Sequence, residues 1–163
     1  FAASATKAFV AEAAKAGVDG IIVVDYPPEE SAELAALLRE HGMDLIFFLA
    51  PTSTDDRVAR VAKLASGYIY YVSLTGVTGA AHLDTRAIGE RLAGIRKRTP
   101  LPLCVGFGIR DGASARAVCE VADAAIIGSR VIQEIESAPG EALQRVPAFL
   151  RGVREAMDAK AAA

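Results

Sequence analysis

The sequence predicts an α/β fold built from five parallel βα units. Five short, nearly continuous apolar runs are typical of strands that are covered on both faces, as in parallel sheets. The longer segments between them carry apolar residues at helical spacing, as Leu34, Leu37 and Leu38 do. Glycine and aspartate fall at the boundaries, where helix caps belong. Together these observations predict one domain over residues 1–163, with a helix before the five units and another after them.

The predicted strands are short runs rich in β-branched and aromatic residues. They are expected at Gly20–Asp25, Leu45–Ala50, Tyr68–Ser73, Leu103–Phe107 and Ala125–Gly128. Five parallel strands can form an open doubly wound sheet or part of an eight-stranded barrel. Periodicity alone does not choose between these two arrangements.

Capping residues and one proline mark the predicted helix ends. Asp111 is a good N-cap for the helix that follows it, and Ser53 with Asp56 predicts a capping box. The last helix is expected over about 141–159, and Pro147 within it predicts a kink or a restart, because proline removes a helical hydrogen bond.

The composition is that of an ordinary globular protein. Apolar residues make up 52% and charged residues 23%, and the formal net charge is -2 with both signs interspersed. The sequence has no basic stripe that would indicate nucleic-acid binding, and it has no apolar run of about 18 residues that would indicate a membrane span. Cys104 and Cys119 lack the spacing of a metal site or a disulfide framework. They are predicted to be reduced core thiols of a cytoplasmic protein without a metal.

Glycines after the last two predicted strands indicate a phosphate site. Segment 105–109 reads VGFGI, and Gly128-Ser129 opens a short helix predicted over 131–135. Glycine lets the backbone approach a ligand, and a helix N-terminus favours an anion. In (β/α)₈ barrels the loops after the last two strands commonly hold phosphate in this way. The alternative is that these glycines make ordinary strand-to-helix turns.

Two other loops are candidates for the active site. Segment 73–81, SLTGVTGAA, is longer than a βα turn needs and resembles a mobile lid; a solvated linker is the alternative. Within it Thr78 can hydrogen-bond a carboxylate or substrate, and Gly79 can offer an N–H to phosphate. Asp25 ends a predicted strand on the side where barrel chemistry occurs, although such an aspartate more often orients a loop.

Aromatic residues crowd the third predicted strand. Tyr68 and Tyr70 share one face, and Tyr71 points the other way. A tyrosine in a barrel mouth can contact a flat aromatic ligand, but core packing is the default for such residues. His41 and His82 have no partner at metal-ligand spacing and are predicted at the surface.

Five segments resemble the tryptophan synthase alpha subunit family in order and spacing. They read AGVDGIIVVDYPPEE, LIFFLAPTSTDDR, GYIYYVSLTGVTGA, VGFGIRD and AAIIGSRVIQEIE, and the combination of SxTGVTGA with GFGI is specific. The resemblance covers nearly the whole chain and implies a partial (β/α)₈ TIM barrel with strands four to eight of the family fold. Leu74 stands where many members have arginine, and Arg130 where many have a small residue.

The resemblance also implies a reaction and its site residues. The family is a lyase of tryptophan biosynthesis, which cleaves indole-3-glycerol phosphate by a retro-aldol reaction to indole and glyceraldehyde 3-phosphate. It has no cofactor of its own, and indole passes to a pyridoxal-phosphate-dependent beta subunit in an alpha2beta2 complex. The implied phosphate-binding residues are Gly79, Phe107, Gly108, Gly128 and Ser129. The implied indole pocket is Ile22, Phe48, Tyr70, Phe107 and Ile126. Thr78 would close the lid, Asp25 would lie near it, and Pro27 would face the beta subunit.

Catalysis is where the chain departs from the family. The reaction needs groups that protonate indole C3 and deprotonate the glycerol hydroxyl. The family's glutamate and aspartate for this work lie upstream of the position of Phe1, so no catalytic residue is expected here. The sequence starts at Phe1 and enters helical sequence almost at once, so it is interpreted as a fragment that has no catalytic activity on its own. An open barrel exposes strand edges, which predicts poor solubility or association with a missing half or a second copy.

Three alternatives remain open from the sequence. One is another phosphate-binding barrel, such as an isomerase or synthase of indole or thiazole biosynthesis. The second is a non-catalytic barrel fragment that binds a partner. The third is a flavodoxin-like receiver or nucleotide domain. A receiver needs a cluster of acidic residues and a lysine at its strand ends, and the lone Asp25 is evidence against this alternative.

Overall fold

Helices and strands alternate along the chain as the sequence predicts. The computed structural model describes residues 3–24, 26–73, 84–106 and 108–159. The strands are β1 (Gly20–Ile22), β2 (Asp44–Leu49), β3 (Ile69–Val72), β4 (Leu103–Gly106) and β5 (Ala124–Ile126). The α-helices are α1 (Ala3–Lys15), α2 (Ala32–Glu40), α3 (Asp55–Leu64), α4 (Thr85–Arg96), α5 (Gly112–Cys119), α6 (Ser129–Ser137) and α7 (Ala142–Asp158). Two 3-10 turns are η1 (Pro28–Glu30) and η2 (Pro139–Glu141).

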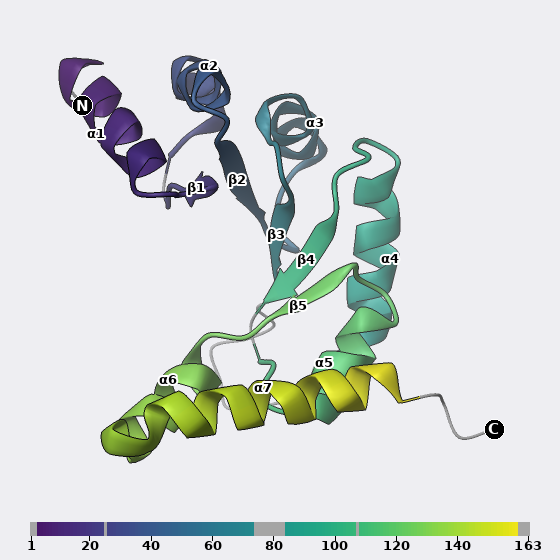
Figure 1. The fold of residues 1–163 in the computed structure, drawn as a ribbon. Helices are drawn as coiled ribbons and strands as arrows, with labels where there is room; N and C mark the ends of the chain where they lie inside the picture. Colours follow the sequence, from purple (N-terminus) through teal and green to yellow (C-terminus); the bar gives the residue numbers. More distant parts are fainter. Residues whose placement is uncertain (1–2, 25, 74–83, 107, 160–163) are drawn as a thin grey trace.

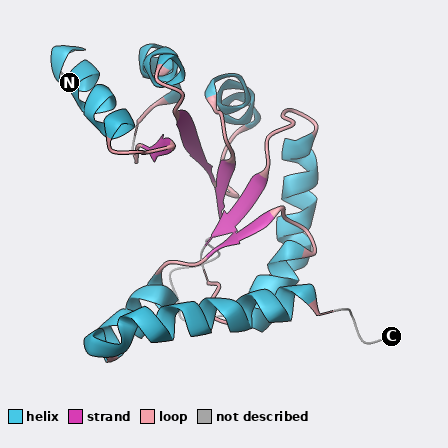
Figure 2. Cartoon of the chain, viewed as in Figure 1, coloured by secondary structure: helices cyan, strands magenta, loops and turns pink. Residues whose placement is uncertain are grey.

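The strands form one parallel sheet in sequential order, β1-β2-β3-β4-β5. The sheet curves, and the helices that connect its strands line its outer side (Figure 1; Figure 2 shows the strands in magenta). A doubly wound sheet instead reverses its strand order at a switch point and carries helices on both faces. Sequential order with helices on one face is the arrangement of a (β/α)₈ barrel. The doubly wound alternative, and the flavodoxin-like domain with it, is therefore wrong.

The outer face of the sheet and the helices form the hydrophobic core. Phe47, Tyr71 and Val105 on this face are 4%, 1% and 0% exposed. Phe48 and Tyr70 alternate with them, lie on the opposite inner face and are only partly buried. The predicted alternation of the tyrosines is thus confirmed, and the inner face is the one left available to a ligand.

The capping box predicted at the start of α3 is wrong by one residue. Thr54 is the N-cap, and its side-chain oxygen accepts a hydrogen bond from the Arg57 N–H at 3.3 Å. The Ser53 hydroxyl instead accepts from the Ala50 N–H at 2.9 Å and closes the turn after β2. Asp56 therefore lies within the first turn of α3 and is not the distal member of a box.

Two further predictions concern the start of α5 and the interior of α7. Asp111 caps α5, accepting from the Ser114 N–H at 2.8 Å, while the Ser114 hydroxyl accepts from the Asp111 N–H at 3.2 Å. The predicted N-cap is confirmed. Of the kink or restart predicted at Pro147, the restart does not occur, because α7 runs continuously through this residue; the kink stays a prediction. Packing of α7 along α5 and α6 keeps the helix continuous across the missing hydrogen bond.

The edge strands are shorter than predicted. β1 ends at Ile22, before the predicted Asp25, and β5 ends at Ile126, before the predicted Gly128. Within the part of the chain that the structure describes, each of these strands pairs with one neighbour only. A strand with one partner has fewer ladder hydrogen bonds, so it leaves the sheet sooner than its apolar sequence indicates.

Large exposed apolar side chains gather at the two ends of the sheet. Helices α2 to α5 have a neighbouring unit on each side, whereas β1 and β5 are edge strands. Within the described residues, the exposed large apolar side chains all belong to the first and last units: Phe9, Val18, Val24, Ile132, Ile135, Leu143 and Leu150. Their position agrees with the prediction of association, which stays a prediction.

Asp123 ties the amino-terminal ends of β4 and β5 together. Its carboxylate accepts from the Leu103 N–H at 2.7 Å and pairs with the Arg96 guanidinium at 2.9 Å. Partial burial raises the pKa of Asp123, but the Leu103 and Arg96 hydrogen bonds outweigh it, so the pKa lies below its usual value. A lowered pKa stabilises the fold above the unfolded-state pKa of about 4, and this contribution is lost as the pH falls through the folded-state value.

We therefore expect Asp123→Asn to lower the free energy of unfolding at pH 7 by about 1 kcal/mol. The difference from the parent chain should start to shrink as the pH falls below the unfolded-state pKa of about 4, and it should disappear once the pH has passed the lower folded-state pKa. Urea unfolding at pH 7 and pH 3 measures both values. An equal difference at the two pH values would contradict the assignment.

Two kinds of feature are absent from the described residues. No helix in these ranges is long and apolar enough to cross a membrane. Among the same residues, no three His, Cys, Asp or Glu side chains gather in a way that could hold a metal ion.

Candidate functional site

Two of the predicted phosphate-binding glycines, Gly108 and Gly128, lie at the carboxyl ends of two adjoining strands. Gly106 pairs with Ile126 in the register of β4 and β5. Gly108 and Gly128 each follow two residues later, so they leave the sheet at the same edge and at the same level. Gly108 has φ of 76°, a left-handed conformation that favours glycine. The structure thus brings Gly108 and Gly128 to one end of the sheet, as the sequence predicts.

Helix α6 begins directly at this edge. It starts at Ser129, two residues earlier than predicted, and ends at Ser137, two residues later. Its N-cap is Gly128, which has no side chain that could hydrogen-bond to the N–H groups of the first turn. The first N–H groups of a helix have no partner within it, and the helix dipole places partial positive charge there. This end of α6 can therefore accept an anion.

The four described residues of the predicted indole pocket share the inner face. Phe48 pairs with Tyr70 in the register of β2 and β3, and Ile22 and Ile126 follow the same alternation on the edge strands. The rings of Phe48 and Tyr70 meet edge to face, with centroids 5.0 Å apart and planes at 65°. Such an arrangement offers an apolar aromatic wall of the kind that a flat ring packs against.

Tyr70 leans over a glycine toward the carboxyl end of the sheet. A Cβ atom at Gly106 would overlap the Tyr70 hydroxyl and ring, so the ring lies directly over the backbone of β4. Burial, with a smaller effect from Tyr68, raises the pKa of Tyr70. The hydroxyl therefore stays neutral at physiological pH and can donate a hydrogen bond.

Other residues of the inner face were not predicted from the sequence as part of the indole pocket. Ile46, Val72, Cys104 and Gly106 share the alternation of Phe48 and Tyr70. Cys104 is 8% exposed, and burial raises the pKa of its thiol, with smaller effects of Asp123 and Cys119 in the same direction. The period of two along each strand is the signal that would have found them.

The start of the predicted lid is anchored to the site. The N–H and the hydroxyl of Ser73 both donate to the carbonyl oxygen of Gly106, each at 3.1 Å. Ser73 is 8% exposed and holds the ends of β3 and β4 together. Of the predicted site residues, Asp25, Thr78, Gly79 and Phe107 lie outside the described residues.

A separate small cavity lies on the other side of the sheet. Its volume is about 130 Å³. It is lined by Pro51, Tyr71, Ser73, Asp84, Ala87, Ile88 and Arg91. Tyr71 points away from Tyr70, so this cavity lies between the outer face and α4. It is not the predicted indole pocket.

Comparison with known proteins gives a consistent picture. A family model described as "Tryptophan synthase alpha chain" matches residues 2–161. The tryptophan synthase alpha chain of Janthinobacterium sp. (strain Marseille) is 59% identical over 151 residues, which are 92% of this chain and 57% of that protein. That of Burkholderia thailandensis is 59% identical over 155 residues, which are 94% of this chain and 57% of that protein. The chain thus spans a little over half the length of these curated relatives.

Solved structures agree. The tryptophan synthase alpha subunit of Legionella pneumophila str. Paris matches with a TM-score of 0.82 at 35% identity, over 94% of this chain and 57% of that one. A tryptophan synthase complex from Pyrococcus furiosus contains a chain that matches with a TM-score of 0.76 at 26% identity, over 91% of this chain and 59% of that one. The predicted fold, five parallel βα units of a (β/α)₈ barrel, is confirmed.

Proposed function

Because this chain belongs to the tryptophan synthase alpha chain family, we propose that it acts in tryptophan biosynthesis as part of a cytoplasmic lyase. The reaction is the retro-aldol cleavage of indole-3-glycerol phosphate to indole and glyceraldehyde 3-phosphate. In this proposal the chain supplies the surfaces that hold the phosphate and the indole ring. The acid and base that break the C–C bond come from a segment outside these 163 residues.

One juxtaposition carries the proposal. Gly108, Gly128 and the N-terminus of α6 meet at the edge of the sheet toward which Tyr70 leans. Main-chain N–H groups at this edge can hold a phosphate dianion, and the Phe48–Tyr70 wall beside them fits a bicyclic aromatic ring. A substrate with a phosphate at one end and an indole at the other matches both surfaces at once.

The roles proposed for individual residues are those that the family resemblance implies. Gly108, Gly128 and Ser129 hold the phosphate through the backbone, joined by Gly79 and Phe107. The indole ring lies against the inner-face residues Ile22, Phe48, Tyr70 and Ile126. From the same resemblance, Thr78 is assigned to closing the lid and Asp25 to a position near the lid. Because the donors are main-chain groups and the acid and base lie elsewhere, the chain needs no metal or cofactor of its own.

We propose that the partner of this chain is the subunit that receives the product indole. The related complex from Pyrococcus furiosus is described as an a2b2 assembly. We place this chain in such an assembly with a beta subunit that holds pyridoxal phosphate, with the exposed Pro27 on the side that faces it.

Mixing the chain with its complement tests the proposed function. The complement is the part of the Janthinobacterium relative that this chain does not match. Indole release from indole-3-glycerol phosphate should be absent with either piece alone and appear with the mixture, because the acid–base groups and the binding surfaces then meet. Release by the isolated chain would overturn the assignment of the carboxylates to another segment. A folded mixture that neither releases indole nor binds inorganic phosphate would overturn the proposed reaction.

One observation favours a second candidate, a barrel fragment that binds a partner without turnover. The exposed large apolar side chains among the described residues lie only on the two end units. A binding fragment would form the mixed complex, detected by sedimentation, and yet release no indole.

A further inference from the structure

Helix α6, which opens the proposed phosphate site, is not held by an apolar face. Ile132 and Ile135 in this helix are 54% and 42% exposed. All residues of α6 are described, and the only buried one is Glu134, at 6% exposure. A carboxylate is an unusual group to bury, because removal of a charge from water is costly unless the charge is paired.

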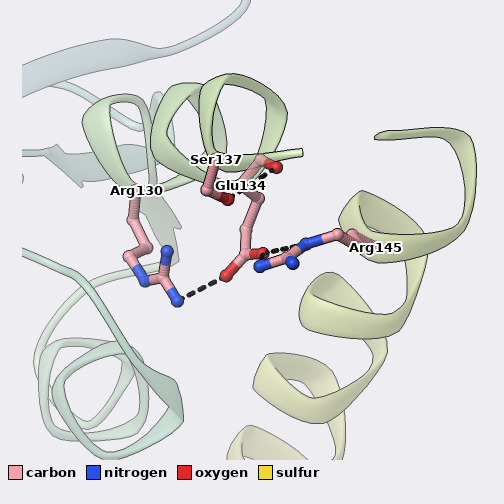
Figure 3. A network of polar contacts seen from close by, with 4 residues as sticks. All are labelled: Arg130, Glu134, Ser137 and Arg145. Carbon is pink, nitrogen blue, oxygen red and sulfur yellow. Dashed lines mark hydrogen bonds and ion pairs between the residues drawn. The ribbon is translucent and has the colours of Figure 1, made fainter. Parts of the chain in front are cut away.

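Two arginines pair with this buried carboxylate (Figure 3). Arg145, from α7, donates through Nε at 3.0 Å and through Nη2 at 2.8 Å to the same oxygen, Oε2. Arg130, from the first turn of α6, pairs with the other oxygen, Oε1. Both carboxylate oxygens are therefore occupied, one from within α6 and one from α7. The hydrogen bonds from Arg145, with the charges of both arginines, lower the pKa of Glu134.

A third contact joins the same two helices. The Arg130 guanidinium lies over the ring of Phe149 in α7, 5.2 Å from its centroid. Arg130 directly follows Ser129, whose N–H belongs to the proposed phosphate site. The network Arg130–Glu134–Arg145 with Phe149 thus connects the N-terminal turn of α6 to α7. Arg130 lies in the same helical turn as the amides of Gly128 and Ser129, so contacts that hold Arg130 in place also restrain this turn.

We infer that Glu134 is a positioning residue for anion binding: held by Arg145 of α7, it fixes Arg130 and so aims the first amides of α6 at the phosphate. This inference rests on the proposed function. It assigns no contact with substrate to Glu134. α7 is the support, because its packing against α5 places Val153 in the core at 6% exposure.

One substitution changes the phosphate affinity in opposite directions, depending on whether Glu134 positions α6 or acts only through its charge. Glu134→Gln keeps the size of the side chain and removes its negative charge. If Glu134 acted only through its charge, the loss of a carboxylate near an anion would tighten phosphate binding. If it positions α6, the neutral amide releases both arginines, and phosphate binding weakens by roughly 3- to 10-fold, a factor of 10 being 1.4 kcal/mol.

The experiment titrates the full chain with inorganic phosphate and follows the amide NMR signals of Gly128 and Ser129. Asp158→Asn is the matched control: it cuts another arginine–carboxylate pair, Arg154–Asp158, on α7 itself and away from α6. It should leave the phosphate affinity unchanged. Glu134→Asp restores the charge one methylene short and should recover part of the affinity.

The outcomes separate the inference from the proposed function. Weaker binding by Glu134→Gln, with Asp158→Asn unchanged, supports the positioning role. Equal or tighter binding by Glu134→Gln overturns it while the phosphate site stands. No shift of the Gly128 and Ser129 signals in the parent chain removes the phosphate site, and the positioning role with it. Should Glu134→Gln fail to fold, Arg145→Lys is titrated instead, and an unchanged affinity for that variant overturns the inference.

Discussion

Replacing Gly106 by alanine is expected to displace the Tyr70 ring and to lower the free energy of unfolding by about 1–3 kcal/mol. A Cβ atom at this position would overlap the Tyr70 hydroxyl and ring carbons. The strand itself cannot yield, because β4 lies between β3 and β5 and is hydrogen-bonded on both sides. The ring must therefore leave its place over β4, which also separates it from Phe48. Urea unfolding measures the stability, and titration with indole measures the pocket.

A double-mutant cycle identifies the cause. In a Tyr70→Ala background the added methyl group meets no ring, so Gly106→Ala should cost much less there than in the parent chain. Gly94→Ala is a control, since no atom lies within 4 Å of a Cβ at that exposed position in α4. An equal cost of Gly106→Ala in both Tyr70 backgrounds would show that the ring does not occupy this place.

Gly112→Ala is expected to separate α5 from α7 and to cost a similar amount, about 1–3 kcal/mol. A Cβ atom at Gly112 would overlap the Cβ of Ala156, with the carbonyl of Gly152 at 3.5 Å. The Cβ of alanine is fixed to its backbone and cannot rotate away, so the two helices must move apart. Thermal unfolding of the variant measures the loss.

A second substitution, Ala156→Gly, tests whether the predicted overlap is the cause of the loss. Ala156→Gly removes the atom that Gly112→Ala would strike. On its own it should cost about 1 kcal/mol, because glycine is a poor helix former. The double variant should be more stable than the sum of the two single losses indicates. Simple additivity of the two losses would mean that the close approach of α5 and α7 is absent in solution.

Much of the architecture could be predicted because local sequence is enough to specify it. The apolar runs located all five strands, and Asp111 located the start of α5. The errors were local choices between neighbouring residues. Ser53 and Thr54 are both good N-caps, and only the turn after β2 decides which hydroxyl faces the helix. Pro147 predicted a kink or a restart, and α7, which packs along α5 and α6, continues through it without a restart.

The candidate site divides in the same way. Gly108 and Gly128 could be predicted at one edge, because consecutive parallel strands end on the same side. The inner-face position of Phe48 and Tyr70 follows from the period of two. Ile46, and Cys104, which was predicted only as a core thiol, lie on the same face but were not predicted as part of the pocket, although the same period of two would have placed them there. Whether these residues bind substrate stays a prediction.

The sequence by itself determined the order of strands and helices, the glycine-rich ends and the family, because these depend on neighbours along the chain. The tertiary structure decided three things. It showed the sequential strand order with helices on one face, which the family resemblance implied but periodicity left open; it placed Tyr70 over Gly106; and it buried Glu134 between Arg130 and Arg145. The physical reason is the same for all three. Burial and pairing depend on segments that are distant in sequence, and an isolated glutamate in an amphipathic helix indicates a solvated charge until the helix beside it is known.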